Sequence, residues 1–174
     1  SRGLGDVYKR QVFDFIHFVS ESQRDWHEIN HNSVVIPNVI SFLDESPCNT
    51  GVAGIIGSLD GNKRTDLSIR RAVEDGFDKI YLYGAVTDSN YYGELVEPLL
   101  SDKIVFKGHE DDIQKMYDSI DVVYHSAESE TFNYIKAECA ATGVKYNGVS
   151  TADAKAEIWS NEDILDEWQK CLEF

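Results

Sequence analysis

Short apolar segments that alternate with helical segments constrain the fold of this chain more strongly than any other feature. Five apolar segments are predicted to be strands: Val52–Ile56, Lys79–Tyr83, Lys103–Phe106, Asp121–His125 and Gly143–Asn147. Five helical segments alternate with them: Thr65–Glu74, Tyr91–Leu100, Asp111–Ser119, Thr131–Thr142 and Glu162–Leu172. Apolar strands joined by helices are typical of a parallel sheet that helices cover on both faces. With right-handed crossovers, the sequence predicts an α/β fold with a doubly wound, Rossmann-like parallel sheet.

The part of the chain that precedes these strands has a different pattern. Val12–Ser20 is rich in Phe and Val and is predicted to be a strand, and the polar segment Ser22–His31 is predicted to be a short helix. Val34–Ile40 is expected to be extended, because Pro37 disfavours helix at the residue before it. Ser41–Thr50 carries the densest turn signals of the chain and is predicted to be a linker.

The acidic charge balance excludes several classes of partner. The chain has 16 Lys and Arg against 31 Asp and Glu, a formal net charge of −15 that repels nucleic acid and anionic membranes. A ligand that carries phosphate therefore needs a local positive site. Three cysteines at no metal-ligand spacing favour a reducing compartment. Neither a membrane span nor a signal peptide is visible, so we expect a cytoplasmic protein.

The beginning of the sequence is unusual. The chain starts at Ser1, and its single methionine is Met116. The stretch Ser1–Gln11 resembles translated sequencing-adapter read-through and is set aside from the fold prediction. We therefore expect residues 1–11 to be a non-native leader on a fragment whose N-terminal part is missing.

Ligands of doubly wound sheets bind outside the carboxyl ends of the strands. The loops expected there are Gly57–Arg64, Gly84–Asn90, Gly108–Asp112 and Ser126–Glu130. The first of them fits neither a Walker A loop nor a dinucleotide fingerprint. Its Lys63 and Arg64 either meet an anion at the strand ends or merely solvate the start of a helix. His125 and Ser126 likewise either contact a ligand or have a structural role.

Two glutamates lie on or beside the predicted helix that follows the fourth strand. Glu130 and Glu138 are eight residues apart, which is about 12 Å along an ideal helix. A catalytic carboxylate pair of a glycosidase is only about 5–9.5 Å apart, so we do not expect the two glutamates to act on one bond. They either contact two ends of one long ligand, or Glu130 caps the helix and Glu138 is solvated.

The segment His27–His31 reads HEINH, which formally matches the zinc-protease motif H-E-x-x-H. That motif needs a helix that places both histidines on one face, and it needs a third ligand. Here a short polar segment runs into an extended one, and no third ligand is evident. We therefore expect surface histidines and no metal site.

The segment from Ser126 to Gly143 resembles the signature of retaining glycosyltransferases of family 4, which have the GT-B fold. The residues that carry this resemblance are Ser126, Glu130, Phe132, Glu138 and Gly143. Three further segments are similar to the same family in the same order: Ile36–Ile40, the loop Gly57-Ser58-Leu59 with Lys63, and Val105–Gly108. The resemblance covers roughly Ile36–Leu172 and implies a C-terminal nucleotide-sugar-binding domain.

The resemblance also implies roles for single residues. Lys63 binds the diphosphate, Glu130 contacts the donor sugar, and Glu138 holds the ribose hydroxyls. The backbone N–H groups of Thr131, Phe132 and Asn133 cradle phosphate at a helix N-terminus. Transfer retains the anomeric configuration and needs no metal, no further cofactor and no evident enzyme nucleophile. The implied donor site comprises Gly57, Ser58, Lys63, Arg64, Gly108, Ser126, Glu130, Thr131, Phe132, Asn133 and Glu138, with Glu130 and Lys63 as its catalytic pair.

The sequence departs from the family pattern at several of these positions. Ser58 stands where the family usually has an arginine, and we expect Arg64 to compensate for the lost charge. Thr131 and Asn133 replace glycines on either side of the phenylalanine, and His125 stands where the family often has proline.

The resemblance divides the chain into a leader (residues 1–11), the end of an acceptor-binding domain (12–33) and a donor-binding domain (34–174). The implied partners are a nucleotide-sugar donor and the acceptor-binding domain, most of which is missing. A nucleotide-sugar epimerase with a GT-B-like fold and a non-catalytic nucleotide-sugar-binding module are the alternatives.

Overall fold

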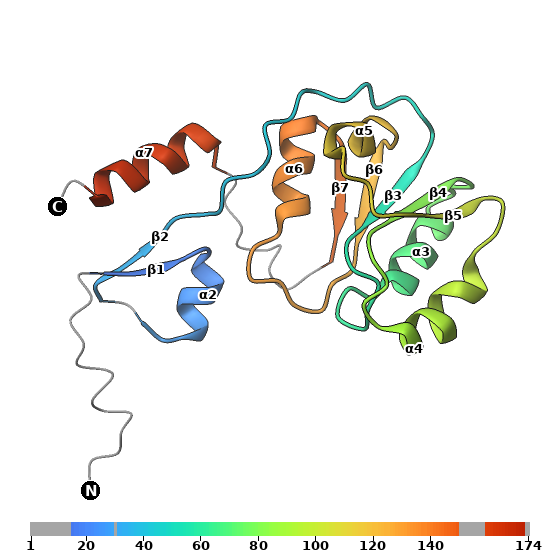
Figure 1. Cartoon of the computed structure of the whole chain (residues 1–174), viewed down its shortest axis with the longest axis horizontal. Coiled ribbons are helices and arrows are strands. Elements are labelled where there is room, and N and C mark those ends of the chain that lie inside the picture. Colours follow the sequence, from blue (N-terminus) through green and yellow to red (C-terminus); the bar gives the residue numbers. More distant parts are fainter. Residues whose placement is uncertain (1–14, 30, 150–158, 173–174) are drawn as a thin grey trace, which may run out of the picture.

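The structure, a computed structural model, describes residues 15–29, 31–149 and 159–172. Its largest part is a five-stranded sheet in which all neighbouring strands are parallel, in the order β5-β4-β3-β6-β7 (Figure 1). The strands are β3 (Ala53–Ile56), β4 (Ile80–Tyr83), β5 (Ile104–Gly108), β6 (Val122–His125) and β7 (Lys145–Gly148). The predicted doubly wound sheet is confirmed, and each of its strands lies within two residues of its predicted bounds.

Helices cover both faces of this sheet. One face packs against α3 (Thr65–Glu74) and against the helical segment after β4, through a core that includes Ile69 and Val96. The other face packs against α5 (Ile113–Asp118) and α6 (Tyr134–Thr142). Because both faces are buried, the strands lack polar alternation, as the sequence indicated.

The order of the strands fixes where the two central loops lie. From β3 the chain moves outward through β4 to β5, and it then returns to place β6 on the other side of β3. The pairing of Ala53 with Val122 aligns β3 and β6 in parallel, so their carboxyl ends point the same way. The topological switch point therefore lies between these two strands, where ligands of such sheets bind.

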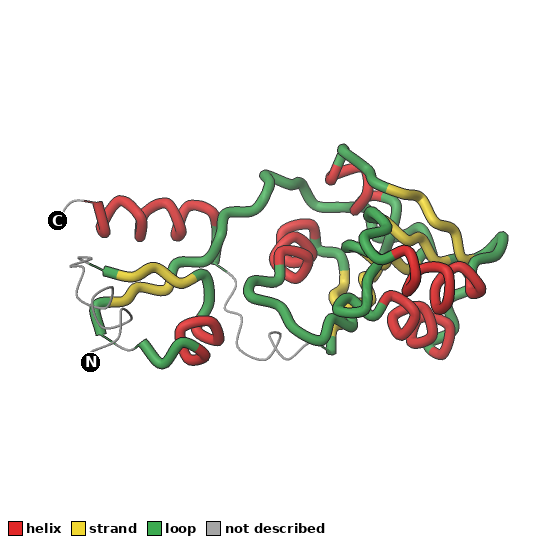
Figure 2. The backbone as a smooth tube through the Cα atoms, turned by 60° about the horizontal axis from the view of Figure 1, so that its bottom comes forward, coloured by secondary structure: helices red, strands yellow, loops and turns green. Residues whose placement is uncertain are grey.

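A smaller unit lies at the other end of the molecule (Figures 1 and 2). It contains the parallel pair β1 (Ile16–Phe18) and β2 (Ser33–Val35), joined by α2 (Glu21–Trp26). The C-terminal helix α7 (Asn161–Leu172) lies beside this pair and not against the five-stranded sheet. The ring of Trp168 lies 4.7 Å from the ring of His17, and the Asn161 side chain bonds to both backbone groups of Ile40, at 3.0 and 2.9 Å.

Several boundaries differ from the prediction. Helix α6 begins at Tyr134 and not at Thr131, because the side chain of Asn133 accepts a hydrogen bond from the backbone N–H of Lys136 and caps the helix there. The segment 91–100 is not one regular helix. It consists of α4 (Ser89–Tyr91), a π-helical turn (Tyr92–Val96) and a 3₁₀ turn (Glu97–Leu99) with proline at its start.

The N-terminal predictions are confirmed in part. The strand expected over Val12–Ser20 is found at Ile16–Phe18, although residues 12–14 lie outside the described part of the chain. The helix expected over Ser22–His31 already ends at Trp26. Only the first part of Val34–Ile40 pairs as a strand, and Ser41–Thr50 has no regular structure, as a linker should.

One close approach between loops is sensitive to a single methyl group. A Cβ at Gly84 would lie 1.8 Å from the carbonyl oxygen of Gly57, and Gly84 has a φ of +142°, which L-residues rarely adopt. We expect Gly84→Ala to lower the free energy of unfolding by on the order of 2–4 kcal/mol, measured by urea denaturation. Gly93→Ala is the control, because its Cβ meets no atom within 4 Å. A similar effect of both substitutions would contradict the prediction.

Candidate functional site

Asn62 joins the loops that follow β3 and β6 through hydrogen bonds of its side chain and its backbone. Its amide Nδ2 donates to the carbonyl of Ser129 at 3.2 Å, and its Oδ1 accepts from the backbone N–H and the hydroxyl of Ser129 at 3.2 and 3.1 Å. Its carbonyl accepts from the N–H of Glu128 at 2.8 Å. Two loops that were predicted to face a ligand therefore form one surface at the switch point.

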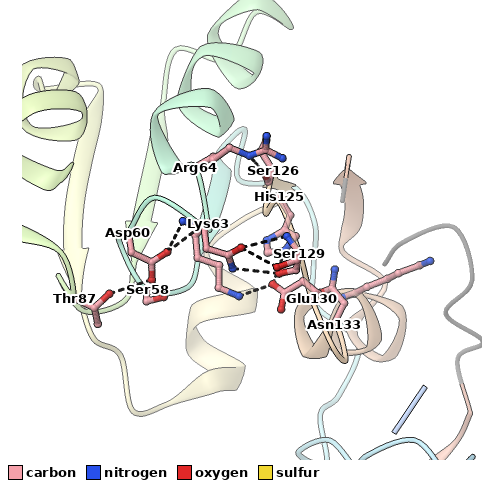
Figure 3. A network of polar contacts seen from close by, with 12 residues as sticks. Ser58, Asp60, Lys63, Arg64, Thr87, His125, Ser126, Ser129, Glu130 and Asn133 are labelled. Carbon is pink, nitrogen blue, oxygen red and sulfur yellow. Dashed lines mark hydrogen bonds and ion pairs between the residues drawn. The ribbon is translucent and has the colours of Figure 1, made fainter. Parts of the chain in front are cut away.

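Three titratable side chains meet on this surface. Lys63 forms an ion pair with Oε1 of Glu130, and the same oxygen lies 3.0 Å from Nε2 of His125 (Figure 3). The side chains of Lys63, Glu130 and His125 are 23%, 13% and 3% exposed, so the cluster runs from a partly open lysine to a buried imidazole. Burial acts to raise the pKa of Glu130, but the bonds from His125 and Lys63 outweigh it and hold that pKa below its ordinary value.

A carboxylate that the sequence analysis missed holds the lysine loop in shape. Oδ1 of Asp60 accepts the backbone N–H groups of Asn62 and Lys63, both at 3.0 Å, and Oδ2 accepts the hydroxyls of Ser58 and Thr87 at 2.6 and 3.1 Å. Burial opposes ionisation of Asp60, yet these four bonds lower its pKa. The available signal was an aspartate two residues before a backbone N–H that it can accept, the pattern of an Asx turn.

The Ser58 hydroxyl, at the position where the resembled pattern usually has an arginine, is not free. Ser58 donates its hydroxyl hydrogen bond to Asp60. Gly57, which precedes it, has a φ of +135°, and its backbone N–H donates to the carbonyl of Tyr83. Arg64 turns back toward the protein, where its Nε donates to the carbonyl of Ser126 at 2.8 Å. Compensation by Arg64 for the missing charge stays a prediction.

Arg71 on α3 is a second residue that sequence reasoning missed. Its Nη1 donates to the carbonyl of His125 and to the hydroxyl of Ser126, at 3.2 and 3.0 Å. Its Nη2 donates to Oδ1 and to the carbonyl of Asn147 on β7, at 2.7 and 3.3 Å. In the sequence Arg71 is one of several charged residues on a helix, and no local signal distinguishes it from a solvated one.

Glu138 lies apart from this cluster, on α6. It is half-buried, and the hydroxyl of Tyr117 donates to its Oε2 at 2.8 Å. The alternative in which Glu138 is solvated is therefore wrong. Burial raises its pKa, and the bond from Tyr117 offsets only part of that rise. Glu130 precedes α6, so the helix-rise estimate of the Glu130–Glu138 distance does not apply to this pair.

The three residues expected at a helix N-terminus are not equivalent. Asn133 is the N-cap of α6, whereas Thr131 and Phe132 precede the helix. The carbonyl of Thr131 accepts a hydrogen bond from Ser20 at 2.7 Å, which ties this loop to the smaller unit. Of the three residues, only Asn133 therefore lies at the N-terminus of α6, where the phosphate was predicted to bind. Contacts of Thr131, Phe132 and Asn133 with a phosphate stay predictions.

The remaining candidates lie elsewhere. Gly108 ends β5, two strands from β3, where its carbonyl accepts from Gly84 at 2.9 Å, so the structure does not bring Gly108 to Lys63. The segment His27–His31 does not lie on a helix, because α2 ends at Trp26 and His27 is its C-cap. Within the described residues, no group of three or more His, Cys, Asp or Glu side chains is placed to hold a metal ion. None of the helices described is both long and apolar enough to cross a membrane.

Comparison with known proteins identifies the architecture. No protein-family model matches the chain, and no curated protein matches it. Among solved structures, it is similar to TarM (18% identity, TM-score 0.65, 93% of this chain and 36% of that chain). It is also similar to Anabaena Alr3699/HepE in complex with UDP and glucose, at 16% identity and a TM-score of 0.66, over 92% of this chain and 55% of that chain. A third similar structure is the pneumococcal O-GlcNAc transferase GtfA in complex with UDP and GlcNAc, at 18% identity and a TM-score of 0.61, over 91% of this chain and 36% of that chain.

These likenesses confirm the fold class: a Rossmann-like sheet of the kind that forms one half of a GT-B glycosyltransferase. A lipopolysaccharide galactosyltransferase, WaaB, shares the architecture at 18% identity and a TM-score of 0.58. The chain spans only about 36–55% of the lengths of these proteins.

The opposite pKa shifts of the two glutamates predict opposite effects of their removal. The pKa of Glu130 is lower in the folded chain than its ordinary 4.5, so its stabilising contribution is complete above that pH and is lost as the pH falls through the folded-state pKa. Glu130→Gln should therefore lower stability at pH 7 by on the order of 1–3 kcal/mol, with a smaller difference near pH 3. Urea denaturation across this pH range measures it.

Glu138→Gln is the matched control. Its folded-state pKa is raised, so the protonated carboxyl group contributes its full stabilisation below its ordinary pKa, and that contribution is lost as the pH rises through the folded-state pKa. At pH 7 a neutral amide at position 138 should cost little or even stabilise. Equal losses for Glu130→Gln and Glu138→Gln at pH 7 would contradict both assignments.

Proposed function

We propose that this chain is the donor-binding part of a glycosyltransferase that transfers a sugar from a nucleotide-diphosphate sugar with retention of configuration. The observation that carries the proposal is the meeting of Lys63 and Glu130 at the switch point of the sheet. A cation and a carboxylate at that place suit the two parts of such a donor, a charged diphosphate and a sugar rich in hydroxyls. Membership of family 4 rests on the sequence resemblance.

Lys63 is the proposed diphosphate ligand. Negative charge grows on the leaving diphosphate as the glycosidic bond breaks, and a fixed ammonium stabilises that charge without a metal ion or a further cofactor. In the structure this ammonium is paired with Glu130, so an incoming diphosphate competes with a carboxylate for the same cation. Donor binding then releases one oxygen of Glu130 from Lys63.

The two glutamates are proposed to contact different parts of the donor. Glu130 follows Ser129 in the loop that Asn62 ties to the lysine loop, and this nearness to Lys63 supports a contact with the sugar beside the diphosphate. Glu138 lies on α6 beside Tyr117 and is proposed to hold the ribose. Two of the similar structures named above are complexes with UDP, which makes UDP-sugars the first probes for this chain.

Acceptor binding is proposed to depend on a second domain. A retaining transfer needs the acceptor in near-attack geometry and a cleft that excludes water. The described residues are proposed to supply one wall of such a cleft, and the similar proteins are longer than this chain. The cytoplasm is the proposed location, because the cysteines favour a reducing compartment.

Substitution of Lys63 tests the proposed phosphate contact. We expect Lys63→Ala to weaken the binding of a sugar nucleotide by on the order of 1.5–3 kcal/mol, because a charge-assisted hydrogen bond is lost. This corresponds to a rise in the dissociation constant of roughly tenfold to more than a hundredfold. Binding of the free nucleoside should not change. Calorimetric titration with UDP-glucose and with uridine measures both.

Lys103→Ala is the control for this variant. Lys103 is 62% exposed and faces Asp78, so its loss makes the same change in net charge away from the site. If Lys63→Ala and Lys103→Ala bind UDP-glucose equally well, Lys63 is not a donor ligand.

Product analysis tests the reaction. We expect the 174-residue chain to bind donor but to form no glycosylated product alone, because acceptor and water-excluding contacts require a second domain. Mass spectrometry after incubation with donor and candidate acceptors measures this. Turnover above roughly 1 per second would show that this chain suffices. An epimerised sugar in the donor would identify an epimerase instead.

A further inference from the structure

His125 is buried beneath the proposed donor site. Its side chain is 3% exposed, its ring lies 6.1 Å from the ring of Tyr146, and its Nε2 lies 3.0 Å from Oε1 of Glu130. Its carbonyl accepts from Val149 at 3.0 Å and from Arg71 at 3.2 Å, so its backbone is held on two sides. The backbone position of His125 therefore does not depend on Glu130.

The carboxylate of Glu130 is held unevenly. Both of its partners, His125 and Lys63, contact the same oxygen, Oε1. Oε2 accepts no hydrogen bond from any residue that the structure describes. One oxygen is thus anchored while the other is left as an acceptor for a ligand hydroxyl.

The two anchors differ in how firmly they are fixed. Lys63 has a long, flexible side chain that is 23% exposed, so it can turn from Glu130 toward an arriving phosphate. The buried ring of His125 has no comparable freedom, because neighbouring side chains surround it. Once a diphosphate claims Lys63, His125 is the partner that remains on Oε1.

We infer that His125 is a positioning residue: it holds the Glu130 carboxylate in place while the diphosphate occupies Lys63, so that Oε2 stays directed at the donor sugar. This inference rests on the proposed function. His125 acts through Glu130 and itself touches no substrate. Glu130 released by both anchors would move toward solvent, and the sugar would lose its acceptor while the diphosphate kept its lysine.

A purely structural role for His125 makes a different prediction. If the imidazole only fills space, its replacement lowers stability and weakens every ligand alike. If it positions Glu130, the affinity for an intact sugar nucleotide falls, and the affinity for the matching nucleoside diphosphate is nearly preserved. The ratio of the two dissociation constants therefore separates the roles.

The experiment compares UDP-glucose with UDP by calorimetry on the full chain. His125→Phe keeps a ring but removes the N–H hydrogen-bond donor. We expect it to raise the dissociation constant of UDP-glucose by on the order of tenfold and that of UDP by less than about threefold. His125→Gln returns an N–H donor and should restore most of the ratio. Should His125→Phe not fold, His125→Asn replaces it, because its shorter amide stops before Oε1.

Tyr124→Phe is the matched control. Tyr124 precedes His125 on β6, is equally buried, and its hydroxyl also donates to a carboxylate, that of Asp75, from the opposite face of the sheet. It should leave the ratio unchanged. An additional Glu130→Gln change should add little to His125→Phe, because both remove the same contact.

The failures of this inference and of the proposed function are distinguishable. If the parent chain binds UDP-glucose through Lys63 but His125→Phe leaves the ratio unchanged, or weakens both ligands alike, His125 is structural and only this inference is overturned. If the parent binds neither UDP-glucose nor, in the same assay, UDP-GlcNAc, UDP-galactose and GDP-mannose, the proposed function and this inference fail together.

Discussion

The parallel pairing of β3 with β6 is the constraint on which the rest of the site depends. These strands are neighbours in space, although β4 and β5 come between them in the sequence. Their pairing brings Lys63 and Glu130, 67 residues apart, into an ion pair. Asn62 then joins the two loops with four hydrogen bonds. The positions of the cation and the carboxylate are therefore set by the strand pairing and by these loop contacts.

The acidic charge of the chain makes local cations important for any anionic ligand. The chain is strongly acidic, so an anionic ligand meets an unfavourable field except at a local cation. Arg64 and Arg71 lie close by in the fold and donate to carbonyl, hydroxyl and amide groups of the protein. Lys63 is instead paired with a carboxylate on a flexible side chain, and we propose it as the group that an anion recruits.

The structure shows what the residues do at three positions where the sequence departs from the pattern that it resembles. Ser58, where that pattern usually has an arginine, donates to Asp60 and helps to hold the loop in shape. His125, in place of proline, supplies a buried donor to Glu130 that proline does not have. Asn133, in place of glycine, caps α6 and delays its start. At each of these three positions the residue present makes a specific side-chain hydrogen bond.

The strands, the main helices and the loops that carry Lys63 and Glu130 could be predicted from the amino-acid sequence alone, because hydrophobic patterning and glycine positions act over a few residues. It took the folded chain to show that Lys63 and His125 share Oε1 of Glu130 and that Arg71 links β6 to β7. The tertiary structure alone placed Tyr117 against Glu138, and α7 beside β1. These contacts join residues far apart in the chain, and they follow from strand order and side-chain burial, which local sequence does not encode.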